Sequence, residues 1–231
     1  MRFRLLATDY DNTIAFHGAV SAAAQDALER VHSSGRALAL VTGRTRAELD
    51  AVFAAPSLFD VLVLENGALL EHEGREELIG APVPEPLVAA MRRSGLAPVA
   101  VGRTIVSTAA ANAERLEEII DALHLDLVLH YNRDSVMVLS PGVDKAVGLR
   151  RAATLLDVPM HDVIAVGDGE NDCAMLRAAG AGVAVDNALQ AVKDCADVVL
   201  TEAGPDGIRE LCDSLVRSDL GDLLGSAAPQ G

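Results

Sequence analysis

One stretch near the start of the chain decides the fold, Leu5-Leu6-Ala7-Thr8-Asp9-Tyr10-Asp11-Asn12-Thr13. Its first four residues form a short, almost wholly apolar run of strand length, and two acids follow at once. A continuous apolar run of this length is typical of a strand buried on both faces, as in a parallel sheet. The carboxyl ends of such strands form the ligand crevice of the sheet, so the segment predicts a central strand that delivers two carboxylates to a site.

The same pattern recurs along the chain, with an apolar run, a polar residue and Gly or Asn nearby in most cases. The further apolar runs are residues 37–41, 61–64, 163–166, 182–185 and 198–200. Segments of helical pattern lie between them, at residues 21–34, 45–55, 145–156, 171–179 and 205–216. Alternating strands and helices predict an α/β fold with a doubly wound, mostly parallel sheet, a Rossmann-like core.

The middle of the chain has a different pattern. It indicates a helix at 85–94, a strand at 98–108, a helix at 112–123 and two strands at 126–131 and 135–139, with a hairpin loop at Asn132-Arg133-Asp134. We therefore expect a small α+β cap inserted at residues 83–141 into a core formed by 1–82 and 142–218. Residues 219–231 are expected to be a flexible tail.

Composition excludes several classes of function. The 231 residues are 50% hydrophobic, enough for a substantial core, and carry a formal net charge of −15. That charge would repel nucleic acid or an anionic membrane surface. No segment is long and apolar enough for a membrane span, and the three cysteines show no metal-binding spacing, so we expect a cytoplasmic protein with reduced thiols. The sequence leaves the oligomeric state open.

Three further motifs join the first pair of acids. Thr42-Gly43-Arg44 offers a hydroxyl and a glycine amide at a helix start, a combination suited to an anion. Lys145 opens a predicted helix in a chain with only two lysines, and we interpret Lys193 as a surface residue. The segment Gly167-Asp168-Gly169-Glu170-Asn171-Asp172 adds more carboxylates at a strand end. Each motif alone is common in turns and caps, but their shared position favours a Mg²⁺ and phosphate site.

In this order, the four motifs resemble those of the haloacid dehalogenase superfamily of phosphohydrolases. The resemblance spans Asp9 to the predicted strand at 198–200, and Asn12 departs from the family, which more often has Gly there. A cap between the second and third motifs is similar to the subgroup of Cof-type sugar phosphatases and sucrose-phosphate phosphatase. The segment Glu65-Asn66-Gly67 also looks like that subgroup.

The resemblance implies a phosphatase that acts on a small phosphorylated metabolite, such as a sugar phosphate or phosphoglycolate, through an aspartyl-phosphate. It assigns Asp9 as nucleophile and Asp11 as acid and base. The phosphoryl group would be bound by Thr42, Gly43, Lys145 and Asn171. Mg²⁺ would be bound by Asp9, the backbone carbonyl of Asp11, Asp168 and, close by or through water, Asp172. In the cap, Arg103, Asn132 and Arg133 are candidate substrate contacts.

Two other classes of function remain open at this point. A phosphomutase would use the same core but return the phosphoryl group to a sugar hydroxyl, and the short predicted cap favours hydrolysis over it. A non-hydrolytic phospho-acceptor or binding protein would need neither the second acid, Asp11, nor a cap.

Overall fold

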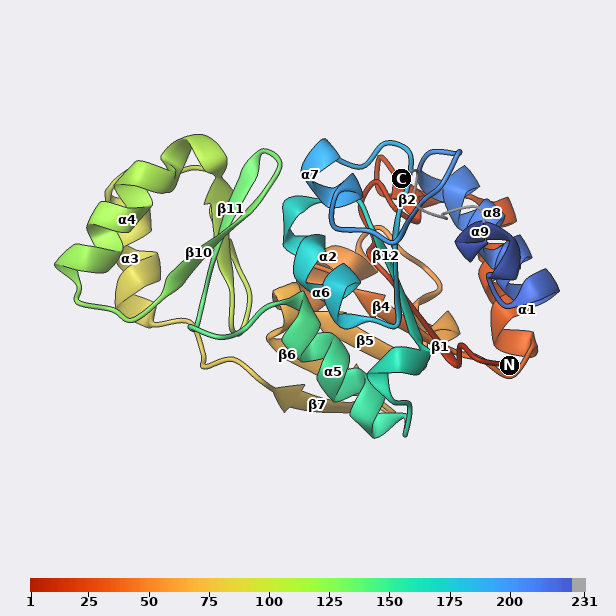
Figure 1. Cartoon of the computed structure of the whole chain (residues 1–231). Helices are drawn as coiled ribbons and strands as arrows, with labels where there is room; N and C mark the ends of the chain where they lie inside the picture. The colour runs from red at the N-terminus through yellow and green to blue at the C-terminus, as the bar shows by residue number, and fades with distance from the viewer. Residues whose placement is uncertain (226–231) are drawn as a thin grey trace.

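The computed structural model describes residues 1–225 and contains one large and one small layer of sheet (Figure 1). The large sheet has eight strands in the order β14-β13-β12-β1-β4-β5-β6-β7. Its strands are β1 (Leu5–Thr8), β4 (Ala37–Val41), β5 (Val61–Leu64), β6 (Leu69–His72), β7 (Arg75–Leu78), β12 (Val163–Gly167), β13 (Ala181–Ala184) and β14 (Val198–Val199). All are parallel except β6 and β7, which pair antiparallel at one edge.

Helices cover both faces of this sheet, as the doubly wound prediction requires (Figure 1). The helices of the core are α1 (Ala22–Ser33), α2 (Arg46–Asp50), α5 (Lys145–Leu155), α6 (Cys173–Ala178), α7 (Gln190–Lys193), α8 (Gly204–Ser218) and α9 (Gly221–Leu224). Helices α5 and α6 pack together, and α1 packs on α8. Strand β1 is fully buried between its neighbours β12 and β4, in register over all four residues.

The small layer, here called the cap, consists of a four-stranded antiparallel sheet and two helices. Its sheet has the order β10-β11-β9-β8. Its elements are α3 (Glu85–Arg93), β8 (Ala100–Val101), β9 (Val106–Ala109), α4 (Ala113–Ala122), β10 (Val128–Asn132) and β11 (Ser135–Leu139). Helices α3 and α4 contact each other and share an apolar cluster with the sheet that is separate from the core of the large layer. The predicted hairpin at Asn132-Arg133-Asp134 joins β10 to β11.

The expected strand at 98–108 is wrong in its middle, where the chain turns. A side chain at Gly102 would lie 2.5 Å from the Glu65 Oε1 atom. The Glu65 carboxylate accepts the backbone N–H groups of Arg103, at 2.9 Å, and of Thr104, at 2.6 Å. This contact with the core splits the segment into β8 and β9. Two short hairpins were not predicted, β6–β7 and the pair β2 (Ala15–Phe16) and β3 (Ala19–Val20).

The expected flexible tail is also wrong for residues 219–225, and residues 226–231 lie outside the described part of the chain. The Asp219 carboxylate accepts bonds from the backbone N–H groups of Arg2 and Phe3 and from the Arg36 guanidinium, at 3.0 Å. Leu220 is fully buried, and α9 follows it. These contacts fix Asp219 against residues near the N-terminus.

The cysteines differ from the expectation of three reduced thiols. Cys173 and Cys195 form a disulfide, with their Cα atoms 5.6 Å apart, while Cys212 is free and buried. Among residues 1–225, no helix has the length and apolar character needed to cross a membrane.

Candidate active site

The carboxyl edge of the large sheet brings Asp9, Lys145 and Asp172 into direct contact. Asp9 follows β1, Lys145 begins α5, and Asp172 ends the 3₁₀ turn η5 (Glu170–Asp172). The Lys145 Nζ atom lies 2.6 Å from the Asp9 Oδ1 atom and 2.6 Å from the Asp172 Oδ1 atom. All three side chains are buried. Burial alone would lower the pKa of Lys145, but the carboxylates of Asp172 and Asp9 raise it above its ordinary value.

Three acids of this edge could share a cation. One carboxylate oxygen from each of Asp9, Asp168 and Asp172 lies within 4.8 Å of the others. Burial raises the pKa of Asp9 well above its ordinary value; Lys145 lowers it, and the two neighbouring carboxylates raise it further. Burial and Asp172 also raise the pKa of Asp168, against the effect of Arg133. Three buried carboxylates this close together repel one another, and a divalent cation with oxygen ligands would relieve that repulsion.

The glycines of the fourth motif let Asp172 fold back on its own loop. Its Oδ2 atom accepts the backbone N–H groups of Asp168 and Gly169, both at 2.9 Å. A side chain at Gly167 would lie 2.5 Å from the Asp172 carboxylate. The loop therefore fixes Asp172 and leaves its Oδ1 atom for Lys145.

Asp11 lies apart from the three buried acids. Its carboxylate accepts two hydrogen bonds from one edge of the Arg44 guanidinium, from the Nε atom at 2.8 Å and from the Nη2 atom at 2.6 Å. The Arg44 guanidinium also lies 5.4 Å from the centre of the Tyr10 ring. Arg44 belongs to the Thr42-Gly43-Arg44 motif, but no role was predicted for it; the signal in the sequence was its place next to Gly43. The Asp11 side chain was not expected to bind metal, and it is not part of the three-acid cluster.

The predicted phosphate-binding residues surround the same edge. Thr42 is buried, and its Oγ1 atom accepts the backbone N–H of Arg44 at 3.1 Å. The Asn171 Nδ2 atom donates to the Asn66 Oδ1 atom at 2.8 Å, a contact that the sequence did not predict. A cavity of about 260 Å³ lies between core and cap, beside Asp9 and Gly43. It is lined by Asp9, Asp11, Gly43, Arg44, Glu48, Ser107, Asn132, Ser135 and Met137.

The three cap candidates take different positions. Asn132 lines the cavity. Arg133 reaches the core, where its guanidinium pairs with Asp168 and its Nη2 atom donates to the Asn187 carbonyl at 3.2 Å. Arg103 points away: its guanidinium pairs with Glu76 at the surface, and only its backbone contacts Glu65. The structure therefore brings two of the three to the site.

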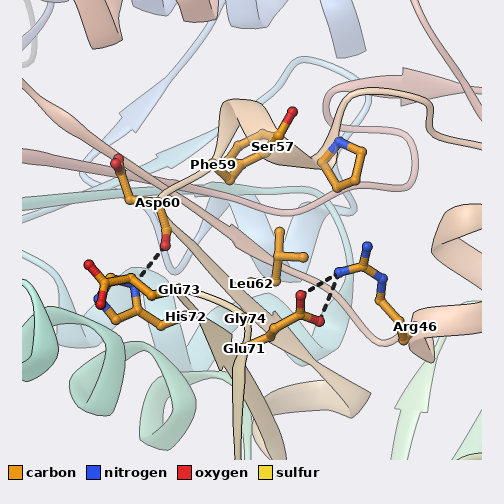
Figure 2. A pocket seen from close by; sticks show the side chains of 10 residues that line it. Arg46, Ser57, Phe59, Asp60, Leu62, Glu71, His72, Glu73 and Gly74 are labelled. Carbon is orange, nitrogen blue, oxygen red and sulfur yellow. Dashed lines mark hydrogen bonds and ion pairs between the residues drawn. The ribbon is translucent and has the colours of Figure 1, made fainter.

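A second cavity, of about 340 Å³, contains none of the predicted site residues. Figure 2 shows it beside the β6–β7 hairpin, where Arg46 pairs with Glu71 and His72 contacts the Asp60 carbonyl. Arg46, Glu71 and Asp60, three of its charged groups, already have partners within the chain. Four predicted site residues, Asp9, Asp11, Gly43 and Asn132, line the smaller cavity, which is therefore the candidate active site.

Comparison with known proteins agrees with this geometry. A family model described as haloacid dehalogenase-like hydrolase matches residues 6–90 and 98–211. Phosphoglycolate phosphatase 2 of Saccharolobus solfataricus is 28% identical over 227 residues, covering 94% of each chain. Phosphoglycolate phosphatase of Methanopyrus kandleri is 30% identical, covering 88% of this chain and 93% of its own.

The solved structures share the fold at low identity. A subclass IIB sugar phosphatase, BT4131, superposes with a TM-score of 0.75 at 19% identity, covering 92% of this chain and 98% of its own. The protein 0175 of Thermoplasma acidophilum gives a TM-score of 0.76 at 16% identity, covering 91% and 97%. The match to the family over most of the sequence shows that this chain belongs to the haloacid dehalogenase-like hydrolases and is a phosphatase of that superfamily.

Proposed function

We propose that this phosphatase is a Mg²⁺-dependent phosphomonoesterase that acts on a small phosphorylated metabolite through an aspartyl-phosphate on Asp9. The observation that carries the proposal is the buried contact of Lys145 with Asp9 and Asp172, since Asp9 also lines the cavity between core and cap. A phosphoryl group placed there would meet a carboxylate nucleophile beside a fixed ammonium. Covalent capture on Asp9 would divide one difficult hydrolysis into two easier steps.

In the first step, an Asp9 carboxylate oxygen forms a bond to phosphorus while the bond from phosphorus to the leaving oxygen breaks. Asp11 gives a proton to that oxygen, which requires its contact with Arg44 to open. In the second step, Asp11 takes a proton from water as the water oxygen attacks phosphorus and the bond from phosphorus to the Asp9 oxygen breaks. The Asp9 carboxylate and orthophosphate are released.

The remaining residues would hold the phosphoryl oxygens while these bonds change. Lys145 provides a charge, Thr42 a hydroxyl, Gly43 a backbone N–H and Asn171 an amide. Mg²⁺, bound by Asp9, Asp168, Asp172 and the Asp11 carbonyl, would neutralise charge on the phosphoryl group. Groups placed in advance around a developing charge account for much of the catalysis in phosphoryl transfer.

The small size of the cavity favours a compact substrate. Its volume of about 260 Å³ lies below the ~300–1,000 Å³ typical of drug-sized ligand pockets. Arg44 is the basic residue of its lining, and its guanidinium could exchange Asp11 for a substrate anion. Two similar proteins are named phosphoglycolate phosphatases, so we place phosphoglycolate first among the candidates, followed by small sugar phosphates.

Release of orthophosphate from a panel of phosphate esters tests the proposal. The panel contains phosphoglycolate, phosphoglycerates, hexose and triose phosphates and p-nitrophenyl phosphate, each with Mg²⁺ and with a chelator. We expect release with Mg²⁺ and a marked preference for one compact ester. If the protein with Mg²⁺ released no more phosphate from any ester than its Asp9→Asn variant does, the proposed reaction would be wrong.

A further inference from the structure

Among residues 1–225, three buried side-chain polar atoms lack a hydrogen-bond partner, and all three belong to asparagines near the proposed phosphate site. They are the Asn66 Nδ2, Asn132 Oδ1 and Asn171 Oδ1 atoms. A buried polar group without a partner costs about 1–3 kcal/mol. Three such atoms in one place therefore require a physical explanation.

Asn171 is fixed on one side by Asn66. Asn66 is fully buried in the 3₁₀ turn η2 (Glu65–Gly67), with a left-handed backbone at φ 58°. Its Oδ1 atom accepts one N–H of the Asn171 amide at 2.8 Å. The same Asn171 nitrogen lies 3.9 Å from the position that a side chain at Gly43 would take. Asn66 thus turns the nitrogen end of Asn171 toward the Thr42-Gly43 turn, where its second N–H is free.

On its other side, Asn171 meets the cap. The Asn132 Oδ1 atom lies 2.3 Å, and the Asn171 Oδ1 atom 3.1 Å, from the position that a side chain at Gly169 would take. Both atoms are acceptors that approach this same position, and two acceptors cannot bond to each other. The two ends of an asparagine amide have nearly the same shape, so a half-turn of Asn132 places its Nδ2 atom there. That single rotation can give both oxygen positions a partner.

We propose that Asn132, Asn171 and Asn66 form an amide relay in which the cap orients the phosphate-binding amide of the core. Asn132 donates to the Asn171 Oδ1 atom, Asn171 donates to Asn66, and the second N–H of Asn171 is left for a phosphoryl oxygen. Asn132 is then a positioning residue and acts through Asn171 rather than on the leaving group. The relay rests on the proposed phosphate-binding role of Asn171.

The relay links the cap to the chemistry. Asn132 ends β10 of the cap, which packs against the 3₁₀ turn η5 of the core that contains Asn171. The cap must therefore be seated before Asn171 is held from both sides. Glu65, next to Asn66, accepts two backbone N–H groups of the cap turn at Arg103 and Thr104. One short turn of the core thus contacts both the cap and the phosphate-binding amide.

Inhibition by orthophosphate separates positioning from direct contact, because orthophosphate has no leaving group for Asn132 to touch. Asn132→Ala should weaken this inhibition about three- to ten-fold, the value of one hydrogen bond, and lower kcat/KM to a similar degree. In a protein that already carries Asn171→Ala, the further substitution Asn132→Ala should change orthophosphate inhibition and kcat/KM by no more than about twofold each. The reason is that the effect of Asn132 passes through Asn171. Asn112→Ala removes a cap asparagine that lies outside the cavity lining and bonds to Thr108; it is the matched control and should leave inhibition by orthophosphate unchanged.

Other outcomes overturn the proposal in distinguishable ways. If Asn132→Ala lowered kcat/KM but left orthophosphate inhibition unchanged, Asn132 would contact the leaving group and the relay would be wrong. If Asn132→Ala weakened orthophosphate inhibition equally in the presence of Asn171 and in the Asn171→Ala protein, the relay would also be rejected. If Asn171→Ala left orthophosphate inhibition unchanged, the phosphate role in the proposed function would fail together with the relay. Asn66→Gly, which suits the left-handed backbone, gives a second test and should weaken orthophosphate inhibition as Asn132→Ala does.

Discussion

Replacement of Asp9 by Asn should abolish turnover without destabilising the protein, because the attraction and the repulsions that act on the Asp9 carboxylate are of similar size. The Asp9 carboxylate lies 2.6 Å from the Lys145 ammonium, an attraction of about 6 kcal/mol at an effective dielectric constant of ~20. It also lies within 4.8 Å of Asp168 and of Asp172, and each repulsion costs about 3–4 kcal/mol on the same scale. The attraction and the repulsions therefore nearly cancel.

Burial then decides whether Asp9→Asn stabilises or destabilises the protein. The Asp9 side chain is almost fully buried, and desolvation disfavours a charged carboxylate. The neutral amide of Asn avoids this cost, and its oxygen still accepts a bond from Lys145. In the absence of metal we expect Asp9→Asn to be as stable as the wild type or more stable by about 1 kcal/mol, which corresponds to about 2–4 °C in Tm for a chain of this size.

Two measurements on the same preparations test this prediction. Phosphate release should fall by roughly 10⁴–10⁶-fold, as for other enzymes that lose their nucleophile or its partner. Urea unfolding in the presence of a chelator should give an unfolding free energy no lower than that of the wild type. A variant that folded normally but kept a tenth of the activity would exclude Asp9 as nucleophile. A loss of more than about 2 kcal/mol in stability would show that the attraction of Lys145 outweighs burial and repulsion.

Four further predictions concern the metal, the acid, the cap and the disulfide. Mg²⁺ at 100 times its Kd should stabilise the wild type by about 2.7 kcal/mol, and Asp168→Ala should remove most of that response in a thermal melt. Asp11→Asn should lower kcat by roughly 10²–10⁴-fold; a change of less than about tenfold in phosphate release would reject its role as acid and base. Arg103→Ala should alter activity on the best metabolite by less than about twofold and stability by less than about 0.5 kcal/mol, because its guanidinium pairs with Glu76 at the surface; a selective loss on that metabolite would restore it as a substrate contact. Reduction of Cys173–Cys195 opens a loop with a sequence separation of 22 and should lower stability by about 3 kcal/mol; an unchanged Tm in reducing agent would contradict this.

The strands of the core could be predicted because their environment is uniform. Residues 5–8, 37–41 and 61–64 are almost wholly apolar, and the structure places each in the large sheet with both faces covered. The β6–β7 hairpin was missed because it lies at the sheet edge, where β7, with the sequence Arg-Glu-Glu-Leu, is largely exposed. An edge strand can carry charged residues and then loses its apolar pattern.

The features that the sequence could not show depend on distant partners. The turn between β8 and β9 is set by Glu65, 38 residues before Arg103. The order of residues 219–225 depends on Asp219, whose partner Arg36 lies 183 residues away. Local pattern contains no information on either contact. For the same reason the sequence could name Asn132 as a cap residue but could not show that it lies beside Gly169 and Asn171.

The charges around the cavity explain why the metal and the phosphate are proposed together. Three buried carboxylates, Asp9, Asp168 and Asp172, face two cations, Lys145 and Arg133, so one negative charge is left over before any ligand binds. A phosphate dianion added beside these buried side chains would meet a net repulsion. A divalent cation supplies the charge that the side chains lack. The acids therefore serve binding of the substrate as well as binding of the metal, and a variant that loses Mg²⁺ should also lose its affinity for orthophosphate.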